Sequence, residues 1–242
     1  MLQANVRSLL AEYSYPSTGI EPIITDLTES GDPDRELGDL PAAAFESREF
    51  FDFEMDAVFR RMWIPVAHVS QVSQIGDYLA VDILNESFMI VRGEDEEVRV
   101  LSRSCLHRWA ALVEGWGNIP GKRIACPFHK WIYDLSGQLV GVPLMQKAAD
   151  FDRRECKLPS LVMRISNGVV LASLVEGRQL PIGEDDTALM AEILAADGPA
   201  RNSRLTVDQN WKAVWQNIIE NAGADLSELD GEIAWTATDT SV

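Results

Sequence analysis

The sequence is poor in cysteine, in histidine and in positive charge. Its 242 residues include three Cys and three His, and so few cysteines do not build a disulfide-stapled secreted domain. The 21 basic residues face 38 acidic ones, and the resulting net charge of −17 argues against nucleic acid as a partner. No apolar run approaches the roughly 18 residues that a membrane-spanning helix needs, so we expect no association with membrane.

What is present is typical of a globular protein. Hydrophobic residues make up 46% of the chain, which suffices for a packed core in one large domain or two smaller ones. The first residues, MLQANVRSLLAEYSYP, lack the charged start, apolar stretch and small-residue cleavage site of a secretory signal. We therefore expect a cytoplasmic protein, in which the isolated Cys156 is a reduced thiol.

Four of the six Cys and His residues fall into two short segments. One residue separates Cys105 from His107, and two separate Cys126 from His129. Two thiolates and two imidazoles suit either one tetrahedral zinc ion or a Rieske [2Fe-2S] cluster, in which two His replace two Cys at one iron. Zinc sites usually pair Cys with Cys and His with His within a segment. The mixed Cys-and-His segments therefore favour the cluster.

The flanking residues carry a family resemblance. Ser104-Cys105-Leu106-His107-Arg108 and Cys126-Pro127-Phe128-His129-Lys130-Trp131-Ile132-Tyr133, followed by Gly137 and Pro143, resemble the Rieske domain of ring-hydroxylating oxygenase large (alpha) subunits. The similarity extends from Phe45 to Leu174. It implies that Cys105, His107, Cys126 and His129 hold a [2Fe-2S] cluster.

Differences from related sequences indicate which type of Rieske cluster the resemblance implies. Trp109 and Lys130 stand where the oxygenase family usually has Gly. Rieske proteins of the respiratory chain have an extra Cys at the positions of Ala110 and Phe128, and a Ser at that of Trp131. Because fewer hydrogen bonds to cluster sulfurs lower the potential, the resemblance implies a low-potential cluster that a ferredoxin or a flavin reductase reduces.

Patterning along the chain predicts an α+β fold in three parts. Residues 1–44 are acidic and rich in Gly and Pro, and we expect an extended arm. Residues 45–175 are expected to form a Rieske-type antiparallel β domain with an entry helix. Residues 176–242 are expected to form a short α+β segment that resembles part of the oxygenase catalytic domain.

The individual elements follow from periodicity and turn signals. Ser47 is the expected N-cap of the entry helix, whose predicted apolar face comprises Phe51, Met55, Val58, Phe59 and Met62. Helices are also expected at 185–196 and at 211–219, where Trp211, Val214, Trp215, Ile218 and Ile219 form an apolar stripe. Strands are expected at 65–69, 77–83, 87–92, 98–103, 123–125, 138–142, 162–166, 169–174 and 204–207, with a hairpin turn at Asn167-Gly168.

Positive charge gathers around the four candidate ligands. Between Leu101 and Tyr133 the chain has one acidic residue, Glu114, and five basic ones, Arg103, Arg108, Lys122, Arg123 and Lys130. This is either ordinary solvated loop charge or a docking face for an acidic electron donor.

The oxygenase resemblance continues past residue 209 but is incomplete. Asn210-Trp211-Lys212 and Glu220-Asn221 resemble the start of the catalytic domain, and Asp225 falls at the position of an acid that bridges the two metal centres. The histidines that would follow are absent, because no His occurs after His129. A two-His-one-carboxylate iron site is therefore incomplete in these residues, and we expect no mononuclear Fe(II) in this chain.

Three functional hypotheses remain open. The chain is the Rieske component of a multicomponent oxygenase, a truncated inactive oxygenase large subunit, or a structural or assembly subunit that keeps its cluster for folding. In the first case a ferredoxin or flavin reductase supplies electrons, and a catalytic subunit with an intact iron site hydroxylates an organic substrate, for which aromatic compounds are candidates. The family resemblance implies a homo- or hetero-oligomer built on a trimer.

Overall fold

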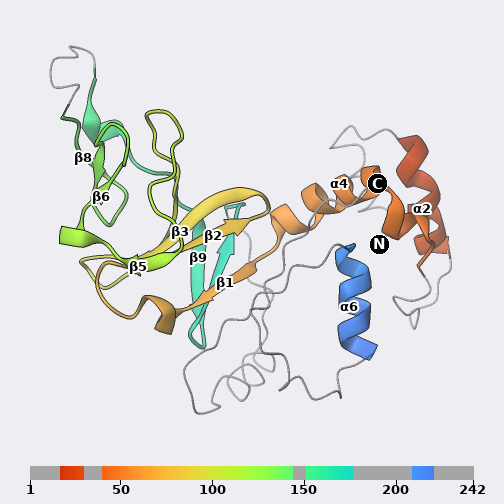
Figure 1. Cartoon of the computed structure of the whole chain (residues 1–242). Coiled ribbons are helices and arrows are strands. Elements are labelled where there is room, and N and C mark those ends of the chain that lie inside the picture. The colour runs from red at the N-terminus through yellow and green to blue at the C-terminus, as the bar shows by residue number, and fades with distance from the viewer. Residues whose placement is uncertain (1–16, 30–39, 144–150, 177–208, 221–242) are drawn as a thin grey trace. The chain divides into compact units, whose positions relative to one another are not determined.

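The structure is a computed structural model that describes residues 17–29, 40–143, 151–176 and 209–220 (Figure 1). The chain divides into two compact units, one of residues 1–60 with 201–242 and one of residues 61–200. Within the described residues, the first unit consists of helices and the second of antiparallel sheets with short 3-10 turns, so the predicted α+β class is confirmed. Among these residues no helix is long and apolar enough to cross a membrane.

Two antiparallel sheets share one core in the second unit. The larger has the order β4-β3-β2-β5, and the smaller has the order β1-β10-β9. Apolar residues of both sheets, such as Val100 and Val170, are fully buried in a common cluster. The bounds are β1 Ile64–His68, β2 Asp77–Ile83, β3 Glu86–Arg92, β4 Val98–Ser102, β5 Trp116–Asn118, β9 Val162–Ser166 and β10 Val169–Ser173.

A third sheet of very short strands carries one of the two Cys-and-His segments. Its order is β6 (Ile124–Ala125), β7 (Ile132–Tyr133) and β8 (Leu139–Gly141). Cys105 and Cys126 belong to a second buried cluster beside Tyr133 and Leu139. Short 3-10 turns complete the unit: η3 (Val69–Val72), η4 (Pro120–Lys122) and η5 (Arg153–Glu155). A further turn, η2 (Phe59–Arg61), contains the chain boundary between the two units.

The strands predicted between residues 65 and 174 are all present within one residue at each end. Asn167 and Gly168 have φ of 47° and 82°, which is the backbone of a tight primed hairpin turn. The sequence did not predict β5 or β7. They have three and two residues, too few for an alternating pattern to be visible.

Residues 17–29 form a helix, α2 (Ser17–Glu29), where an extended arm was expected. Gly19 and Pro22 suggested irregular chain, because proline cannot donate a hydrogen bond within a helix. Ile20, Ile23 and Ile24 nevertheless lie on one face at helical spacing and are buried. They pack in one cluster with aromatic residues of the following helices, and this burial outweighs the local helix breakers.

The entry helix is present but buries a different face from the one predicted. α4 (Arg48–Ala57) begins at Ser47, whose Oγ accepts a hydrogen bond of 3.2 Å from the Phe50 amide, as predicted. Its buried apolar residues are Phe50, Phe53 and Ala57. The predicted face was wrong because α4 ends at Ala57, which leaves Val58 and Met62 outside the helix and exposed. A short helix, α3 (Ala43–Glu46), precedes it.

The helix expected at 211–219 is present as α6 (Trp211–Glu220), but its packing differs from the prediction. Trp215 is 51% exposed, whereas Lys212 is 2% exposed. The reason is a buried ion pair, in which Lys212 Nζ lies 2.6 Å from Glu54 Oε2. By its contacts α4 groups with α2 and α6, not with the β domain. The elements expected at 185–196 and 204–207 lie outside the described residues.

Candidate functional site

The two Cys-and-His segments form two loops with the same backbone. In the first loop (residues 105–110) the Cys105 amide donates to the Ala110 carbonyl at 2.8 Å. In the second loop (residues 126–131) the Cys126 amide donates to the Trp131 carbonyl, also at 2.8 Å. Each loop thus closes five residues after its Cys and presents one thiol and one imidazole, with the His two residues after Cys105 in the first loop and three residues after Cys126 in the second.

Both loops turn back through a residue in the left-handed region. Trp109 and Lys130 each have φ of 58°, and each amide donates to the carbonyl of the Cys four residues earlier. Glycine adopts this backbone without strain, whereas a larger residue is strained there. The two loops therefore share one conformation although neither has glycine at the turn.

The structure brings all four predicted ligands together as two pairs. Cys105 and Cys126 are 1% exposed, are not joined in a disulfide, and interact with one another. The imidazole rings of His107 and His129 are half-buried and perpendicular, with centroids 4.6 Å apart. The thiols therefore lie in the core and the imidazoles lie nearer the surface.

These side chains fit a [2Fe-2S] cluster. His107 Nδ1 is buried and has no hydrogen-bond partner among the described residues, as expected of a nitrogen that bonds a metal. Burial raises the pKa of the Cys105 thiol, but a bound metal deprotonates a coordinating thiol. A Rieske cluster takes two thiolates at one iron and two imidazoles at the other, which is the pairing that the loops present. No group of three or more Cys, His, Asp or Glu in the described residues is arranged to hold a single ion.

Tyr133 supports the first loop and was not singled out from the sequence. Its hydroxyl lies 3.4 Å from Cys105 Sγ and accepts a hydrogen bond of 3.1 Å from the Leu106 amide. Since the Leu106 amide occupies one lone pair, the O–H is free to point at the sulfur. Burial raises the pKa of this phenol, so it stays protonated and remains a donor. No local sequence signal distinguishes it from a core tyrosine.

Trp131 covers one face of the His107 imidazole. The two rings are stacked, with centroids 5.2 Å apart and an angle of 17°. Trp131 is buried and also packs against Phe151 at 5.5 Å. The stacking fixes the orientation of the His107 ring from the opposite loop. Loss of hydration, with the neighbouring His129 and Arg108 charges, lowers the pKa of His107.

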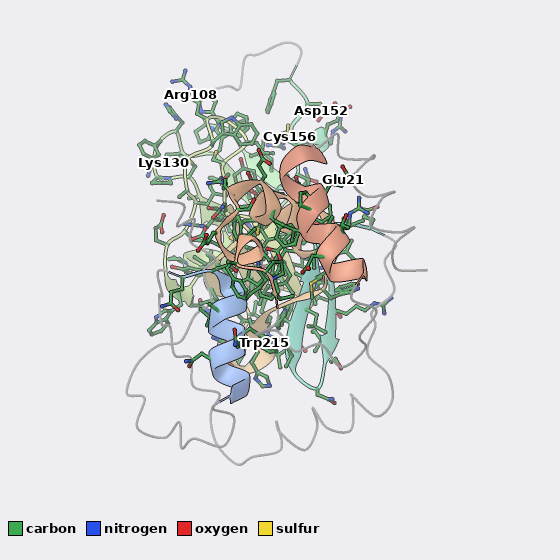
Figure 2. All side chains as sticks on the ribbon, turned by 90° about the vertical axis from the view of Figure 1, so that its right-hand side faces the viewer. Glu21, Arg108, Lys130, Asp152, Cys156 and Trp215 are labelled. Carbon is green, nitrogen blue, oxygen red and sulfur yellow. The ribbon has the colours of Figure 1, made fainter. Side chains whose placement is uncertain are left out.

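The five basic residues around the site have different surroundings. Arg103 pairs with Asp82 and Glu114, each at 3.0 Å, and Arg123 pairs with Glu94 at 3.2 Å. Lys122 Nζ donates to the Ile75 carbonyl. By contrast, the side chains of Arg108 and Lys130 are exposed and make no ion pair or hydrogen bond with the described residues. Figure 2 shows both projecting outward at the same end of the unit.

The remaining candidates are placed elsewhere or not described. Asp225, the candidate bridging acid, lies outside the described residues. His68 has a structural role, because its side chain caps the η3 turn. Its Nδ1 lies 2.8 Å from Ser70 Oγ and 3.3 Å from the Ser70 amide nitrogen. Cys156 is a partly exposed free thiol.

Comparison with known proteins agrees with this geometry. The model of the Rieske [2Fe-2S] domain matches residues 62–160. The carnitine monooxygenase oxygenase subunit of Escherichia coli K12 is 28% identical over 189 residues, which are 77% of this chain and 50% of the relative.

Solved structures show the same kinship. One is a quaternary ammonium Rieske monooxygenase, described for carnitine oxidation by gut microbiota and inter-subunit electron transfer. It is 30% identical with a TM-score of 0.57, over 64% of this chain and 41% of that one. Another is naphthalene 1,2-dioxygenase from Rhodococcus sp. bound to indole, at 26% identity and a TM-score of 0.56, over 68% and 36%.

The two loops therefore belong to a Rieske [2Fe-2S] domain, the class of domain that holds a two-iron cluster. More particularly, the chain is a relative of the large (alpha) subunits of Rieske oxygenases. It spans about half the length of the curated relatives reported for carnitine and glycine betaine, which are oxygenase subunits of monooxygenases.

Proposed function

We propose that this chain is the Rieske iron–sulfur component of a multicomponent non-heme iron oxygenase. It receives electrons from a ferredoxin or flavin reductase and passes them to a mononuclear iron on a partner or neighbouring subunit. The observation that carries the proposal is the pair of equivalent loops, which bring two buried thiols and two half-buried imidazoles together.

The residues of this chain have separate tasks in the proposed function. Cys105 and Cys126 would hold the cluster on its core side, and His107 and His129 would hold it on the side that faces solvent. A bound Rieske cluster supplies reversible one-electron storage. The Tyr133 hydroxyl lies 3.4 Å from the Cys105 sulfur, and a hydrogen bond from it to a bound thiolate would tune the potential.

The place of the acceptor iron follows from the shortage of ligands. Residues 130–242 contain no His, so we place a two-His-one-carboxylate iron on another subunit. A related structure described for inter-subunit electron transfer supports this arrangement. Asp225 is a candidate for the carboxylate that couples the two centres. The organic substrate would bind beside the acceptor iron, and relatives named for carnitine and naphthalene leave its class broad.

The cytoplasm is the compartment we propose. Its reducing conditions disfavour disulfides, and none of the three cysteines of this chain is joined in a disulfide.

Ligand assignment is tested by replacing each Cys and His in the full chain. We expect Cys105→Ser, Cys126→Ser, His107→Ala and His129→Ala to lose the visible absorption of the cluster. The sequence offers matched controls, since His68→Ala and Cys156→Ala remove the only other His and Cys and should retain it. A control variant that loses the cluster, or a ligand variant that keeps an unchanged spectrum, would contradict the assignment.

Function is tested by electron uptake followed by oxygen consumption. NADH with a ferredoxin reductase and ferredoxin should reduce the loaded chain by one electron. The chain alone should show no oxygen uptake with carnitine or naphthalene, whereas coexpression with an oxygenase subunit that has an intact iron site should produce it. Turnover by the chain alone would show that the acceptor iron lies in this chain after all.

A further inference from the structure

The two loops carry different side chains at the residue that closes them. The Cys105 amide donates to the Ala110 carbonyl, and the Cys126 amide donates to the Trp131 carbonyl, each at 2.8 Å. Ala110 and Trp131 therefore occupy equivalent backbone positions. The first loop has a methyl group at this position and the second has an indole ring, so two similar backbones surround their ligands with unequal side chains.

The indole ring of Trp131 lies against the imidazole of the other loop. It is stacked on His107, with ring centroids 5.2 Å apart and an angle of 17°, and Trp131 is 5% exposed. Ala110 has no ring to offer His129. Among the described residues, the ring contact of His129 is the perpendicular one with His107 at 4.6 Å. One of the two candidate imidazole ligands is therefore covered by an aromatic face and the other is not.

Trp131 is itself held at both ends. Its carbonyl closes the second loop through the hydrogen bond from the Cys126 amide. Its ring packs against the half-buried Phe151, with centroids 5.5 Å apart and an angle of 52°. Both residues belong to the packing around the buried cluster that contains the two thiols. Because backbone and ring are both fixed, the indole is a rigid surface for His107.

The stack takes the place of the contact that usually orients a metal-bound imidazole. Such a ring normally donates its second N–H to a carboxylate or a carbonyl, which fixes its plane. The His107 imidazole makes no hydrogen bond with any described residue, and its buried Nδ1 is the nitrogen suited to bond iron. Bonding through Nδ1 alone leaves the ring free to turn about that bond. The flat face of Trp131 removes this freedom for His107.

We propose that Trp131 is a positioning residue that makes the two imidazole ligands inequivalent. It fixes the ring plane of His107 and keeps water from one face of that ring, whereas His129 is free to turn. A reduced cluster carries one more negative charge than an oxidised one, and an apolar cover disfavours the more highly charged state. Trp131 therefore also lowers the reduction potential. The proposal rests on the proposed function, since it presumes a cluster on these imidazoles.

The test is pulsed EPR of the reduced, loaded full chain with ¹⁵N-labelled histidine, which reports the coupling of each bound imidazole separately. W131L should change and broaden one of the two couplings and leave the other as in the wild type. W131F keeps an aromatic face and should restore both couplings. The matched control is W116L, which removes a tryptophan that is 82% exposed on β5 and should change neither coupling.

A redox titration gives a second readout. At the midpoint potential of the wild type, W131L should raise the ratio of reduced to oxidised cluster by about threefold, and W131F should leave it unchanged. F151L removes the support of the indole and should shift the ratio in the same direction by a smaller amount. Loss of packing alone would lower the unfolding temperature without singling out one imidazole.

Unchanged couplings and an unchanged ratio in W131L, with an intact cluster, would overturn the proposal. Equal changes at both imidazoles would overturn it too, since the stack involves His107 alone. If W131L holds no cluster, F151L decides, and wild-type couplings in F151L would then contradict the proposal. A wild type whose reduced form shows no histidine coupling would instead refute the proposed function.

Discussion

Tyr133 is the single residue best placed to set the cluster potential. Its hydroxyl lies 3.4 Å from Cys105 Sγ, and a hydrogen bond to a thiolate ligand stabilises the more negative, reduced state. We expect Tyr133→Phe to lower the midpoint potential by on the order of 50 mV, which is about 1 kcal/mol for a one-electron couple. Spectroelectrochemical titration measures this change.

A second tyrosine provides the control for this substitution. Tyr78 packs against the same buried cluster but donates its hydroxyl to the Glu114 carbonyl at 3.2 Å, not to a ligand sulfur. Tyr78→Phe should therefore leave the potential unchanged. Equal potentials for Tyr133→Phe and the wild type would mean that the hydroxyl does not act on the cluster.

The strained turns of the two loops give a prediction about stability. Trp109→Gly and Lys130→Gly should each raise the free energy of unfolding by up to about 1 kcal/mol, because glycine adopts φ of 58° without strain. Arg108→Gly should lower it, since Arg108 is not in the left-handed region and glycine adds entropy to the unfolded chain. Denaturant unfolding of the loaded chain measures the free energy of unfolding of the three variants. A lower value in all three would contradict the claim that the backbone at Trp109 and Lys130 is strained.

At the scale of elements, the β9–β10 hairpin depends on Gly168. Its φ is 82°, and an added Cβ would lie 2.3 Å from His68 Nε2. Gly168→Ala should therefore destabilise the β domain by about 1–3 kcal/mol. Gly121→Ala isolates the backbone part, because Gly121 has φ of 61° with open space around it. Similar losses in the two variants would mean that the contact with His68 is relieved without cost.

The helices of the first unit are joined by the buried Glu54–Lys212 pair. Lys212 Nζ also lies 5.1 Å from the Trp211 ring and 5.4 Å from the Phe50 ring. Removing one partner of a buried pair leaves an uncompensated charge and costs about 3–5 kcal/mol. Lys212→Met should therefore lower the protection of α6 amides against hydrogen exchange by that amount. The double variant E54Q/K212M should recover most of it.

The loss of stability caused by Lys212→Met should also depend on pH. Burial raises the pKa of Glu54 above its ordinary value of 4.5, while Lys212 lowers it; without Lys212 the pKa of Glu54 rises further. When a group has a higher pKa in the folded state than in the unfolded state, the folded protein loses stability as pH rises from the unfolded pKa through the folded pKa. The deficit should therefore be smallest near pH 4.5 and grow toward neutral pH. A deficit that shrinks as pH rises would contradict this.

The sequence predicted the elements whose ends are determined by local signals, such as a helix cap or a turn. Ser47 fixed the start of α4, and Asn167-Gly168 fixed the hairpin, because a side-chain cap and a left-handed turn are local requirements. Partners distant in sequence were not predictable. Glu54 and Lys212 are 158 positions apart, and an isolated lysine in a helical pattern gives no sign of burial.

At the scale of the whole molecule, the sequence predicted the four candidate metal ligands of the site but not the residues that surround them. The rarity of Cys and His singled out the four candidate ligands, and the structure brings them together. Tyr133 and the stacking of Trp131 on His107 depend on how the first loop meets β7, which no local pattern encodes. The sequence also does not show which basic residues are unpaired. In the structure Arg103, Arg123 and Lys122 have acidic or carbonyl partners, whereas Arg108 and Lys130 are exposed.

Mössbauer spectroscopy of the full chain, loaded with ⁵⁷Fe, tests the central claim most directly. A cluster held by Cys105, Cys126, His107 and His129 has one iron with thiolate ligands and one with imidazole ligands. We predict two distinct iron environments in equal amount, with the extra electron localised on the imidazole-bound iron after reduction. One zinc ion per chain with no iron, or two equivalent thiolate-bound irons, would contradict the assignment of these four residues to a Rieske cluster.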